Sequence, residues 1–353
     1  MQIVIRADAS VQMGIGHIMR CLTLSDAFRQ DGADVSFICR QLDGHMIEAI
    51  EQKKYPVFVL DALAQDSALT DIQAEDARAS LPIIERIRPD WLIVDHYDLG
   101  IQWHTRVKPV CKKLMVIDDL ADRPLLCDVL LDQTYQRQES DYADLVPASC
   151  KILTGSQYAL LRPEFAHLRD KSLKRRLSPS LNNMLISLGG TDSENITGRI
   201  LLALRQCALP SVLTITVVLG PTAPHLNSVR LLADTMPNTT QVKVNVQNMA
   251  ELMADSDISI GAAGSTTWER CCLGLPTINI VLADNQQMIA ETLVTEQVTW
   301  LARKETLVQD LNNIFSGLTP DELAEKSRKA MQITDGLGVK RVISVSADVY
   351  SND

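Results

Sequence analysis

The residues best suited to chemistry lie in the loop that follows the first expected strand, at residues 2–6. That loop contains Gly14 and Gly16 and leads directly into His17, where a helix expected at 17–30 begins. A glycine-containing turn between a strand and a helix exposes backbone N–H groups to a ligand. The positive end of the helix disfavours an imidazolium, so we expect His17 to be neutral and able to accept a proton.

Other interpretations of this loop can be compared with the first. A dinucleotide-binding turn needs G-x-G-x-x-G/A and an acidic residue about 20 residues on. Here Met19 occupies the third glycine position, and the expected strand at 34–39 is followed by Arg40. No G-x-x-x-x-G-K-[ST] sequence occurs, which excludes a Walker loop. The glycines could also simply let strand and helix pack, with His17 as a capping residue.

The second half of the chain contains a loop with the same strand–loop–helix order. Gly189 and Gly190 follow an expected strand at 184–188, Thr191 adds a hydroxyl, and Asp192 could cap the next helix. Backbone N–H groups at such a loop would suit a diphosphate. A plain turn without a ligand would use the same residues, and the sequence leaves both interpretations open.

A third loop of this kind follows the expected strand at 257–260. It consists of small residues, with an acid one turn into a helix expected at 265–273: Ala263, Gly264, Ser265, Thr266 and Glu269. An ionised carboxylate acts only as an acceptor, so Glu269 could bind both hydroxyls of a ribose. Glu269 could also simply complement the helix dipole.

Acidic residues follow two other expected strands. Asp95 and Tyr97 belong to an Asp-His-Tyr sequence after the first of these strands, and Asp118 and Asp119 follow the second. Any of the three aspartates could orient His17 or bind polar groups of a sugar. The Asp-His-Tyr sequence could equally form a structural hydrogen-bond cluster.

Two further residues are candidates with less local context. Asn285 follows the expected strand at 276–281 and could reach a ligand, although Asp-Asn pairs also occur in ordinary turns. Arg162 could reach the ligand or form an ion pair within its own domain, and the sequence does not decide between these roles.

Strand-like and helix-like runs alternate along nearly the whole chain, which is typical of right-handed βαβ units that build parallel sheets. The expected strands lie at 2–6, 34–39, 56–60, 90–94, 114–117, 128–131, 151–154, 184–188, 212–219, 241–246, 257–260, 276–281 and 298–301. The expected helices lie at 17–30, 44–53, 66–87, 99–112, 193–207, 224–235, 249–255, 265–273, 285–297, 304–316 and 320–334. Pro82 is expected to interrupt the third helix.

This pattern predicts an α/β fold with two doubly wound, Rossmann-like domains. The first would span residues 1–168 and carry His17, and the second would span 184–353. The basic, polar segment 169–183 between them is interpreted as a linker. Because ligands of such sheets lie beyond the carboxyl ends of the strands, we expect the candidate loops to face a cleft between the domains.

Composition narrows the class of protein. The chain of 353 residues is 46% hydrophobic and 22% charged, as expected of a folded globular protein. Its net charge of −10 argues against a nucleic-acid partner, and neither a secretory signal nor an uninterrupted apolar span is visible. The eight cysteines form no C-x-x-C pair and the six histidines show no metal-ligand spacing. We therefore expect a cytoplasmic protein without a metal or cofactor.

The motifs occur together in a definite order: Arg6-x-Asp8-x-Ser10-x-x-x-Gly14-x-Gly16-His17-x-x-Arg20, Val94-Asp95-His96-Tyr97, Ile117-Asp118-Asp119, Tyr158 to Phe165, Gly189-Gly190-Thr191-Asp192 and Ala263 to Glu269. This set, which spans most of the chain, resembles the UDP-sugar hydrolases of pseudaminic acid biosynthesis, the PseG family. That family has the two-domain GT-B architecture of MurG-like glycosyltransferases. In such proteins a terminal helix often returns to the first domain, and residues 336–350 could do so.

The resemblance implies a specific reaction. Water would replace UDP at the anomeric carbon of UDP-2,4-diacetamido-2,4,6-trideoxy-β-L-altropyranose with inversion, and His17 would be the general base. Tyr97 and Asn285 are expected to position water or the N-acetyl groups. The expected substrate-binding residues are Arg6, Asp8, Gly14, Gly16, Asp95, Arg162, Gly189, Gly190, Thr191, Ala263, Gly264, Ser265, Thr266 and Glu269.

Other functions remain open from the sequence. A UDP-sugar glycosyltransferase of the GT-B type would use the same loops, with His17 deprotonating an acceptor hydroxyl. A non-catalytic UDP-sugar sensor would keep the glycine loops but would need no base. We expect a small-molecule UDP-sugar as ligand, no nucleic-acid or membrane partner, and a monomer or weak homo-oligomer.

Overall fold

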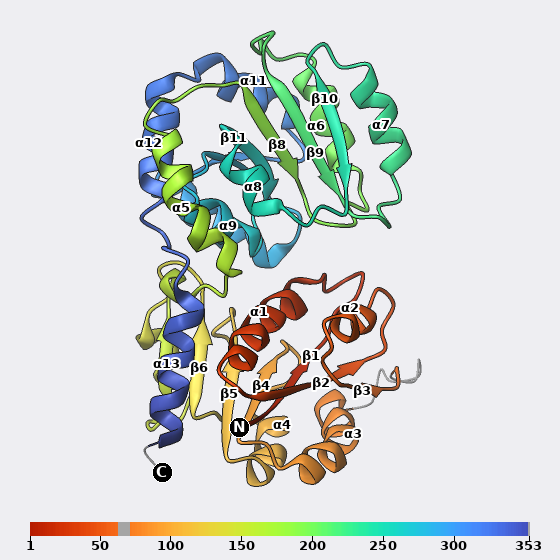
Figure 1. The fold of residues 1–353 in the computed structure, drawn as a ribbon, viewed down its shortest axis with the longest axis vertical. Coiled ribbons are helices and arrows are strands. Elements are labelled where there is room, and N and C mark those ends of the chain that lie inside the picture. The colour runs from red at the N-terminus through yellow and green to blue at the C-terminus, as the bar shows by residue number, and fades with distance from the viewer. Residues whose placement is uncertain (63–70, 352–353) are drawn as a thin grey trace. The chain divides into compact units, whose positions relative to one another are not determined.

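The computed structural model describes residues 1–62 and 71–351, and these residues form two compact units. Unit 1 comprises residues 1–161 together with the C-terminal segment from 337 onward, and unit 2 comprises residues 162–336. Each unit contains one parallel sheet flanked by helices (Figure 1). The expected fold class, two Rossmann-like α/β domains, is therefore confirmed.

Unit 1 is built on a seven-stranded sheet with the order β3-β2-β1-β4-β5-β6-β7. Its strands are β1 (Gln2–Ala7), β2 (Asp34–Arg40), β3 (Val57–Leu60), β4 (Trp91–Asp95), β5 (Lys113–Ile117), β6 (Val129–Asp132) and β7 (Lys151–Thr154). The central strands are continuous apolar runs because helices cover both faces of a parallel sheet. Ile5 and Ile93, paired across β1 and β4, are fully buried.

The helices of unit 1 connect these strands and cover the sheet. They are α1 (Gly16–Gln30), α2 (Ile47–Gln52), α3 (Ile72–Ile87), α4 (Ile101–Val107) and α13 (Gly338–Ser351), with short 3₁₀ helices η2 (Lys108–Val110), η3 (Glu139–Tyr142) and η4 (Ser156–Tyr158). The last helix, α13, packs against α1 and η4 (Figure 1). Its Val342 is fully buried in the same apolar cluster as Ile18 and Leu22 of α1, so this helix is part of the core of unit 1.

Unit 2 is built on a six-stranded sheet with the order β10-β9-β8-β11-β12-β13. Its strands are β8 (Asn183–Ser187), β9 (Thr214–Leu219), β10 (Thr240–Val244), β11 (Ile258–Ala262), β12 (Thr277–Ile280) and β13 (Trp300–Ala302). Its helices are α5 (Pro163–Arg175), α6 (Ile196–Leu204), α7 (Leu226–Asp234), α8 (Met249–Ala254), α9 (Thr266–Cys272), α10 (Gln287–Thr295), α11 (Leu307–Gly317) and α12 (Pro320–Ala330), with the 3₁₀ helix η5 (Asp284–Gln286).

The division of the chain differs from the one expected. The expected linker at 169–183 begins with the second half of α5, and unit 2 already starts at Arg162. A basic, polar composition suggested a linker, but Phe165 and Ser172 of α5 are fully buried, and Arg176, just beyond the helix, is buried as well. Arg176 donates to the backbone carbonyls of Leu273, Ser256 and Met253. Arg176 thus holds the end of α5 against α8 and the end of α9, and the segment does not act as a linker.

The third expected helix also differs in detail. Residues 66–70 of the range 66–87 lie outside the described residues, and α3 continues through Pro82 without interruption. A proline removes the hydrogen bond to the carbonyl four residues earlier, here Arg78. Both residues are exposed, so water can satisfy that carbonyl and the helix persists.

The strand order reverses direction at one place in each sheet. β1 lies between β2 and β4, and β8 lies between β9 and β11. In doubly wound sheets this is where ligands bind, beyond the carboxyl ends of the strands. The loops after β1 and β4 in unit 1, and after β8 and β11 in unit 2, are the ones that carry most of the candidate residues.

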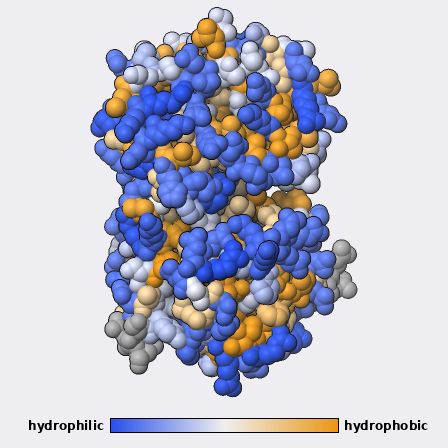
Figure 2. Space-filling view, viewed as in Figure 1, coloured by the Kyte–Doolittle hydropathy of each residue, from blue (hydrophilic) through white to orange (hydrophobic). Residues whose placement is uncertain are grey.

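The visible face of each unit is mostly hydrophilic with scattered hydrophobic residues (Figure 2). No helix among the described residues has the length and apolarity needed to cross a bilayer.

Candidate functional site

The loop between β1 and α1 is folded around Ser10. The Ser10 hydroxyl accepts from the N–H of Met13 at 3.0 Å, and its carbonyl accepts from the N–H of Gly14 at 2.8 Å. Gly14 adopts a φ of +78°, which a side chain would strain. Gly16 begins α1, and its N-cap residue Ile15 makes no side-chain capping bond. The tight turn therefore delivers the chain into α1 with His17 in the first turn.

His17 is held by a carboxylate. Its Nδ1 lies 2.6 Å from Oδ1 of Asp95, at the end of β4, and the Asp95 side chain is fully buried. Nδ1 also lies 3.3 Å from Nη2 of Arg20. An ionised carboxylate only accepts, so the shorter contact places the hydrogen on Nδ1 and leaves Nε2 of a neutral ring with its lone pair. This arrangement makes Nε2 the atom able to take a proton.

Arg20, one turn further along α1, binds the same carboxylate. Its Nε donates to Oδ2 of Asp95 at 2.6 Å and its Nη2 to Oδ1 at 2.7 Å. Its Nη1 donates to Asp119 at 2.7 and 3.0 Å. Burial alone would raise the pKa of Asp95, but the charges and hydrogen bonds of Arg20 and His17 hold it well below its usual range.

Tyr97 completes this group. Its ring meets that of His17 edge-on, with the ring centroids 4.7 Å apart, and its hydroxyl donates to Oδ2 of Asp119 at 3.0 Å. Burial and the Asp119 carboxylate raise the pKa of Tyr97, so the hydroxyl keeps its proton. With that hydrogen directed at Asp119, the oxygen of Tyr97 can offer only lone pairs to a further partner.

Arg6 and Asp8 lie in a separate buried ion network. Both are almost completely buried. The Arg6 guanidinium donates to Asp8, to Asp76 on α3 and to the carbonyl of Ile38, and these contacts engage all its N–H groups. As placed, Arg6 has no donor left for a substrate. The expectation that it binds one overlooked the pairing across three elements that the fold produces.

Asp8 has a second set of partners in this network. Its carboxylate accepts from the backbone N–H of Arg40 at 2.7 Å and lies 3.2 Å from Nε2 of His96. His96 thus joins the structural network, while its neighbours Asp95 and Tyr97 join the group around His17. The Asp-His-Tyr sequence therefore serves two clusters, a division that its sequence does not reveal.

In unit 2, the loop after β8 has free space beside the backbone of its two glycines, Gly189 and Gly190. Gly189 adopts a φ of +104°, and a Cβ at Gly189 or Gly190 would meet no atom within 4 Å. Asp192 accepts from the N–H groups of Ile196 and Thr197, both at 2.9 Å, and so caps the first turn of α6. Thr191 is exposed beside these glycines. This leaves unobstructed backbone at the carboxyl end of β8.

The side chain of Arg270 holds the loop after β11 in place through hydrogen bonds to residues at both ends of the loop. Arg270 is 2% exposed, and it donates to the carbonyl of Ala262 at 2.7 Å and to the hydroxyl of Thr266 at 3.0 Å. A Cβ at Gly261 would lie 2.5 Å from Nη1 of Arg270, so only glycine leaves room for this cation. Ala263 is buried, whereas Gly264 and Thr266 are half-buried and Ser265 is exposed.

Glu269 lies one turn into α9, and its side chain is 16% exposed. Burial raises the pKa of Glu269 to about 7, although the charge of Arg162 opposes this shift. Arg162 lies 3.7 Å from Oε1 of Glu269 and 2.9 Å from Oε1 of Glu164. The structure thus shows ion pairs for Arg162, one of the two roles that the sequence left open.

Asn285 lies in η5, and its side chain is outside the described part of the structure. Within unit 1, the structure gathers His17, Asp95 and Tyr97, and it adds Arg20 and Asp119 with definite contacts. In the sequence, Arg20 stands out only as the last residue of the Arg6 to Arg20 motif. Its spacing of three residues from His17, which places both on one face of α1, is the signal that could have identified it. No comparable spacing in the sequence indicates the role of Arg270 in the loop after β11.

Among residues 1–62 and 71–351, no three histidine, cysteine, aspartate or glutamate side chains are arranged to hold a metal ion.

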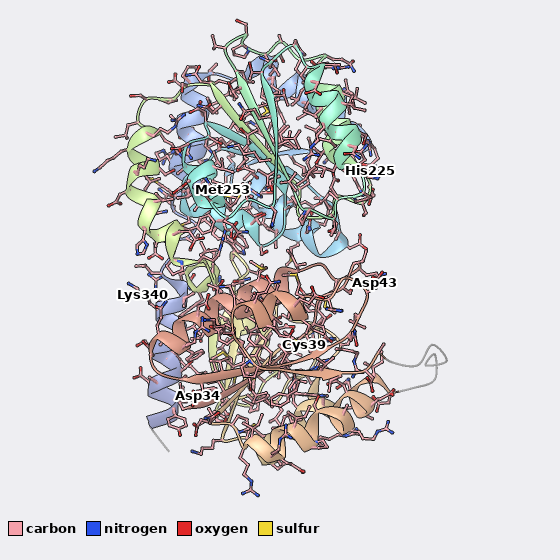
Figure 3. All side chains as sticks on the ribbon, turned by 45° about the vertical axis from the view of Figure 1, so that its right-hand side comes forward. Asp34, Cys39, Asp43, His225, Met253 and Lys340 are labelled. Atoms are coloured by element: carbon pink, nitrogen blue, oxygen red, sulfur yellow. The ribbon has the colours of Figure 1, made fainter. Side chains whose placement is uncertain are left out.

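Figure 3 shows the side chains of both units, with Cys39 on β2 and Asp43 in the loop that follows it. That loop contacts the His17 loop, because the N–H of Val11 donates to the carbonyl of Asp43 at 2.9 Å.

Comparison with known proteins gives two kinds of similarity. Residues 185–342 match the glycosyltransferase family 28 C-terminal domain. The chain is 28% identical over 305 residues to the UDP-2,4-diacetamido-2,4,6-trideoxy-β-L-altropyranose hydrolase of Campylobacter jejuni, which covers 86% of this chain and 97% of that protein. It is 23% identical to the spore coat polysaccharide biosynthesis protein SpsG of Bacillus subtilis over the full length of both.

The similarity to solved structures concerns the fold. MurG of Acinetobacter baumannii superposes with a TM-score of 0.75 at 16% identity, covering 98% of this chain and 99% of that one. The matched C-terminal domain is the one that carries the loops after β8 and β11. The chain therefore has the two-domain GT-B fold that MurG also has, and over most of its length it is similar in sequence to the Campylobacter jejuni hydrolase.

Proposed function

We propose that this protein is a UDP-sugar hydrolase that releases UDP from UDP-2,4-diacetamido-2,4,6-trideoxy-β-L-altropyranose, as the name of its Campylobacter jejuni relative suggests. The observation that carries the proposal is the contact of 2.6 Å between His17 and Asp95, which leaves Nε2 as a proton acceptor. A positioned general base contributes about 10²- to 10⁴-fold to the rate of such a reaction.

The neighbouring tyrosine suggests how water would be oriented. Nε2 of His17 and the hydroxyl oxygen of Tyr97 are both acceptors, because the Tyr97 hydrogen is directed at Asp119. A water molecule that donates one hydrogen to each acceptor keeps a lone pair for attack on the anomeric carbon. As the bond to UDP breaks, the first proton passes to Nε2 and the bonding electrons leave with the diphosphate, giving inversion.

Unit 2 would bind the nucleotide. Open backbone at Gly189 and Gly190 suits the diphosphate, and the Thr266 and Ser265 hydroxyls offer donors near Gly264. The Glu269 carboxylate would accept both ribose hydroxyls. The side chain of Ala263 in this loop is small and buried, so the backbone there would be able to approach the ligand closely. We propose that Gly14 and Gly16, on the His17 loop, give the sugar close access to the base.

The test compares two nucleotide sugars. The purified protein is incubated with the diacetamido UDP-sugar or with UDP-N-acetylglucosamine, without any acceptor, and the products are identified by mass spectrometry. We expect rapid release of UDP and the free diacetamido sugar, with oxygen-18 from solvent at the anomeric position. His167→Ala, which removes an exposed side chain of α5, serves as the matched control for His17→Ala. Clear preference for UDP-N-acetylglucosamine would overturn the assigned substrate.

A glycosyltransferase is the second candidate, favoured by the match of unit 2 to the glycosyltransferase family 28 C-terminal domain. In that case His17 would deprotonate a sugar hydroxyl of an acceptor. UDP release that begins only after an acceptor is added would establish the transferase. The free cysteines of the structure are consistent with action in the reducing cytoplasm, which we propose as the location.

A further inference from the structure

We propose that Arg20 is a positioning residue that fixes both proton acceptors of the reaction, His17 through Asp95 and Tyr97 through Asp119. This inference rests on the proposed function for its effect on rate, but its effect on His17 is independent of any substrate. Arg20 itself need not touch the sugar, since its side chain is only 7% exposed.

The first step of the argument is the geometry of the guanidinium. Nε and Nη2 of Arg20 donate hydrogen bonds to the two oxygens of Asp95 at 2.6 and 2.7 Å. This bidentate contact fixes the plane of the carboxylate. Nη1 binds both oxygens of Asp119, the shorter contact being 2.7 Å. One planar cation thus joins the carboxylates that follow β4 and β5, and a lysine could not reproduce this pairing.

The second step concerns the hydrogen on His17. Asp95 is fully buried, and a buried carboxyl without a cation beside it would tend to take up a proton. A protonated Asp95 could donate to Nδ1 of His17, which would move the ring hydrogen to Nε2. His17 in that form could not accept a proton from water. Arg20 therefore keeps Asp95 as a pure acceptor and keeps Nε2 free.

The third step is the set of charged and titratable groups around the Asp95 carboxylate. From α1 these are His17, Arg20 and Cys21, whose Sγ lies 3.5 Å from Oδ2 of Asp95. From the loops after β4 and β5 they are Tyr97 and Asp119. Burial raises the pKa of the Cys21 thiol well above its usual value, so Cys21 stays neutral. Arg20 is therefore the cation that compensates two carboxylates in this group.

The fourth step is Tyr97. Its hydroxyl hydrogen is directed by Asp119, and Asp119 is held in turn by Arg20. Loss of Arg20 would free Asp119 to turn toward solvent, since that side chain is 19% exposed. The two acceptors proposed to hold the attacking water would then lose their common support. The predicted consequence is a lower rate with little change in the binding of nucleotide.

The experiment uses Arg20→Lys, with Arg29→Lys as matched control. Arg29 lies near the other end of α1, where it is 44% exposed and pairs with Asp26. The tautomer of His17 is measured by ¹⁵N NMR of the ligand-free protein, and kcat, KM and the pH profile are measured with the diacetamido UDP-sugar. In Arg20→Lys, which keeps a charge but cannot contact both carboxylates, we expect kcat to fall by roughly 10- to 100-fold, part of the contribution of a general base. In Arg20→Ala, which leaves Asp95 without a cation beside it, we expect a new Nε2–H population on His17. KM should change less than about threefold.

Rescue separates positioning from a structural role. In Arg20→Ala, added guanidinium should restore part of kcat and the Nδ1–H form, whereas methylammonium, which cannot contact both carboxylates at once, should restore less of kcat. Asp119→Asn leaves the hydrogen bonds from Arg20 to Asp95 in place, so it should lower kcat without moving the His17 hydrogen. A folded Arg20→Ala protein that keeps the wild-type tautomer without added guanidinium would overturn the inference. Because the tautomer is read without substrate, this failure is distinct from a failure to hydrolyse the UDP-sugar.

Discussion

At the scale of single residues, the state of His17 depends on its neighbours. Asp95 contacts Nδ1 of the ring, and Arg20 contacts the same carboxylate. The sequence suggested neutrality from the helix position alone. The structure adds a carboxylate and a guanidinium in direct contact, and from the carboxylate contact we infer that Nδ1 carries the hydrogen. The Asp95 carboxylate therefore orients the His17 ring and fixes its hydrogen on Nδ1, in addition to contributing a negative charge.

Asp95→Asn should therefore inactivate the protein. An amide can donate to Nδ1, which would place the ring hydrogen on Nε2, so we expect kcat to fall by about 10²- to 10⁴-fold. The affinity for UDP, measured by calorimetry, should change little because Asp95 lies in unit 1. Asp98→Asn, an exposed neighbour, is the control. Equal losses of kcat and UDP affinity would contradict the assigned role.

Glu269 predicts a pH dependence of nucleotide binding. Its pKa is raised to about 7, so the carboxylate is mostly ionised above that pH and mostly protonated below it. If the ionised form accepts the ribose hydroxyls, UDP affinity should rise by about tenfold between pH 6 and pH 8. Glu269→Gln should retain only the dependence that UDP's own phosphate produces. Identical profiles for the two proteins would rule out this role.

At the scale of elements, the buried network of unit 1 ties three of them together. Asp76 on α3 accepts from Arg6 of β1 at 2.6 Å and from Arg40 of β2 at 2.8 Å. Burial alone would raise the pKa of Asp76, but these two cations hold it at about 2. Since the folded-state pKa lies below the unfolded value of about 3.9, this pairing stabilises the fold at neutral pH and fades in acid.

Asp76→Asn should destabilise unit 1 at neutral pH. The substitution leaves Arg6 and Arg40 without a shared counter-charge, which costs about 3–5 kcal/mol. The difference from wild type should narrow as pH falls from about 4 toward 2, where Asp76 becomes protonated in both states. Urea unfolding at several pH values measures this, with exposed Asp144→Asn as control. A difference independent of pH would refute the electrostatic explanation.

At the scale of the whole molecule, the chain crosses between its two units twice. It enters unit 2 at Arg162 and returns to unit 1 at residue 337. The returning helix α13 adds buried Val342 to the core and places Tyr350 so that its hydroxyl donates to Asp90 at 2.7 Å. Unit 1 is thus completed by a segment more than 170 residues distant along the chain.

Removal of residues 337–353 should lower the stability of unit 1 more than that of unit 2. Truncation exposes the apolar surface of α1 that Val342 covers, and each fully buried aliphatic side chain contributes about 1.5–3 kcal/mol. Hydrogen exchange followed by peptide mass spectrometry should show loss of protection in α1 and η4, while β8 and β9 remain protected. Equal loss in both units would show that α13 does not act locally.

The sequence by itself determined the class of fold and the positions of the loops that matter. Apolar strand runs and amphipathic helices are local patterns, and their alternation predicts parallel sheets whose strand ends carry the glycine loops and His17. Only the tertiary structure decided which polar residues are partners. Asp95 was one of three aspartates considered for His17, and Arg6 was expected to bind substrate but is paired inside unit 1. Such pairings join residues about 70 to 100 positions apart, as in His17–Asp95 and Arg20–Asp119. They depend on strand order and side-chain packing, which no local pattern encodes.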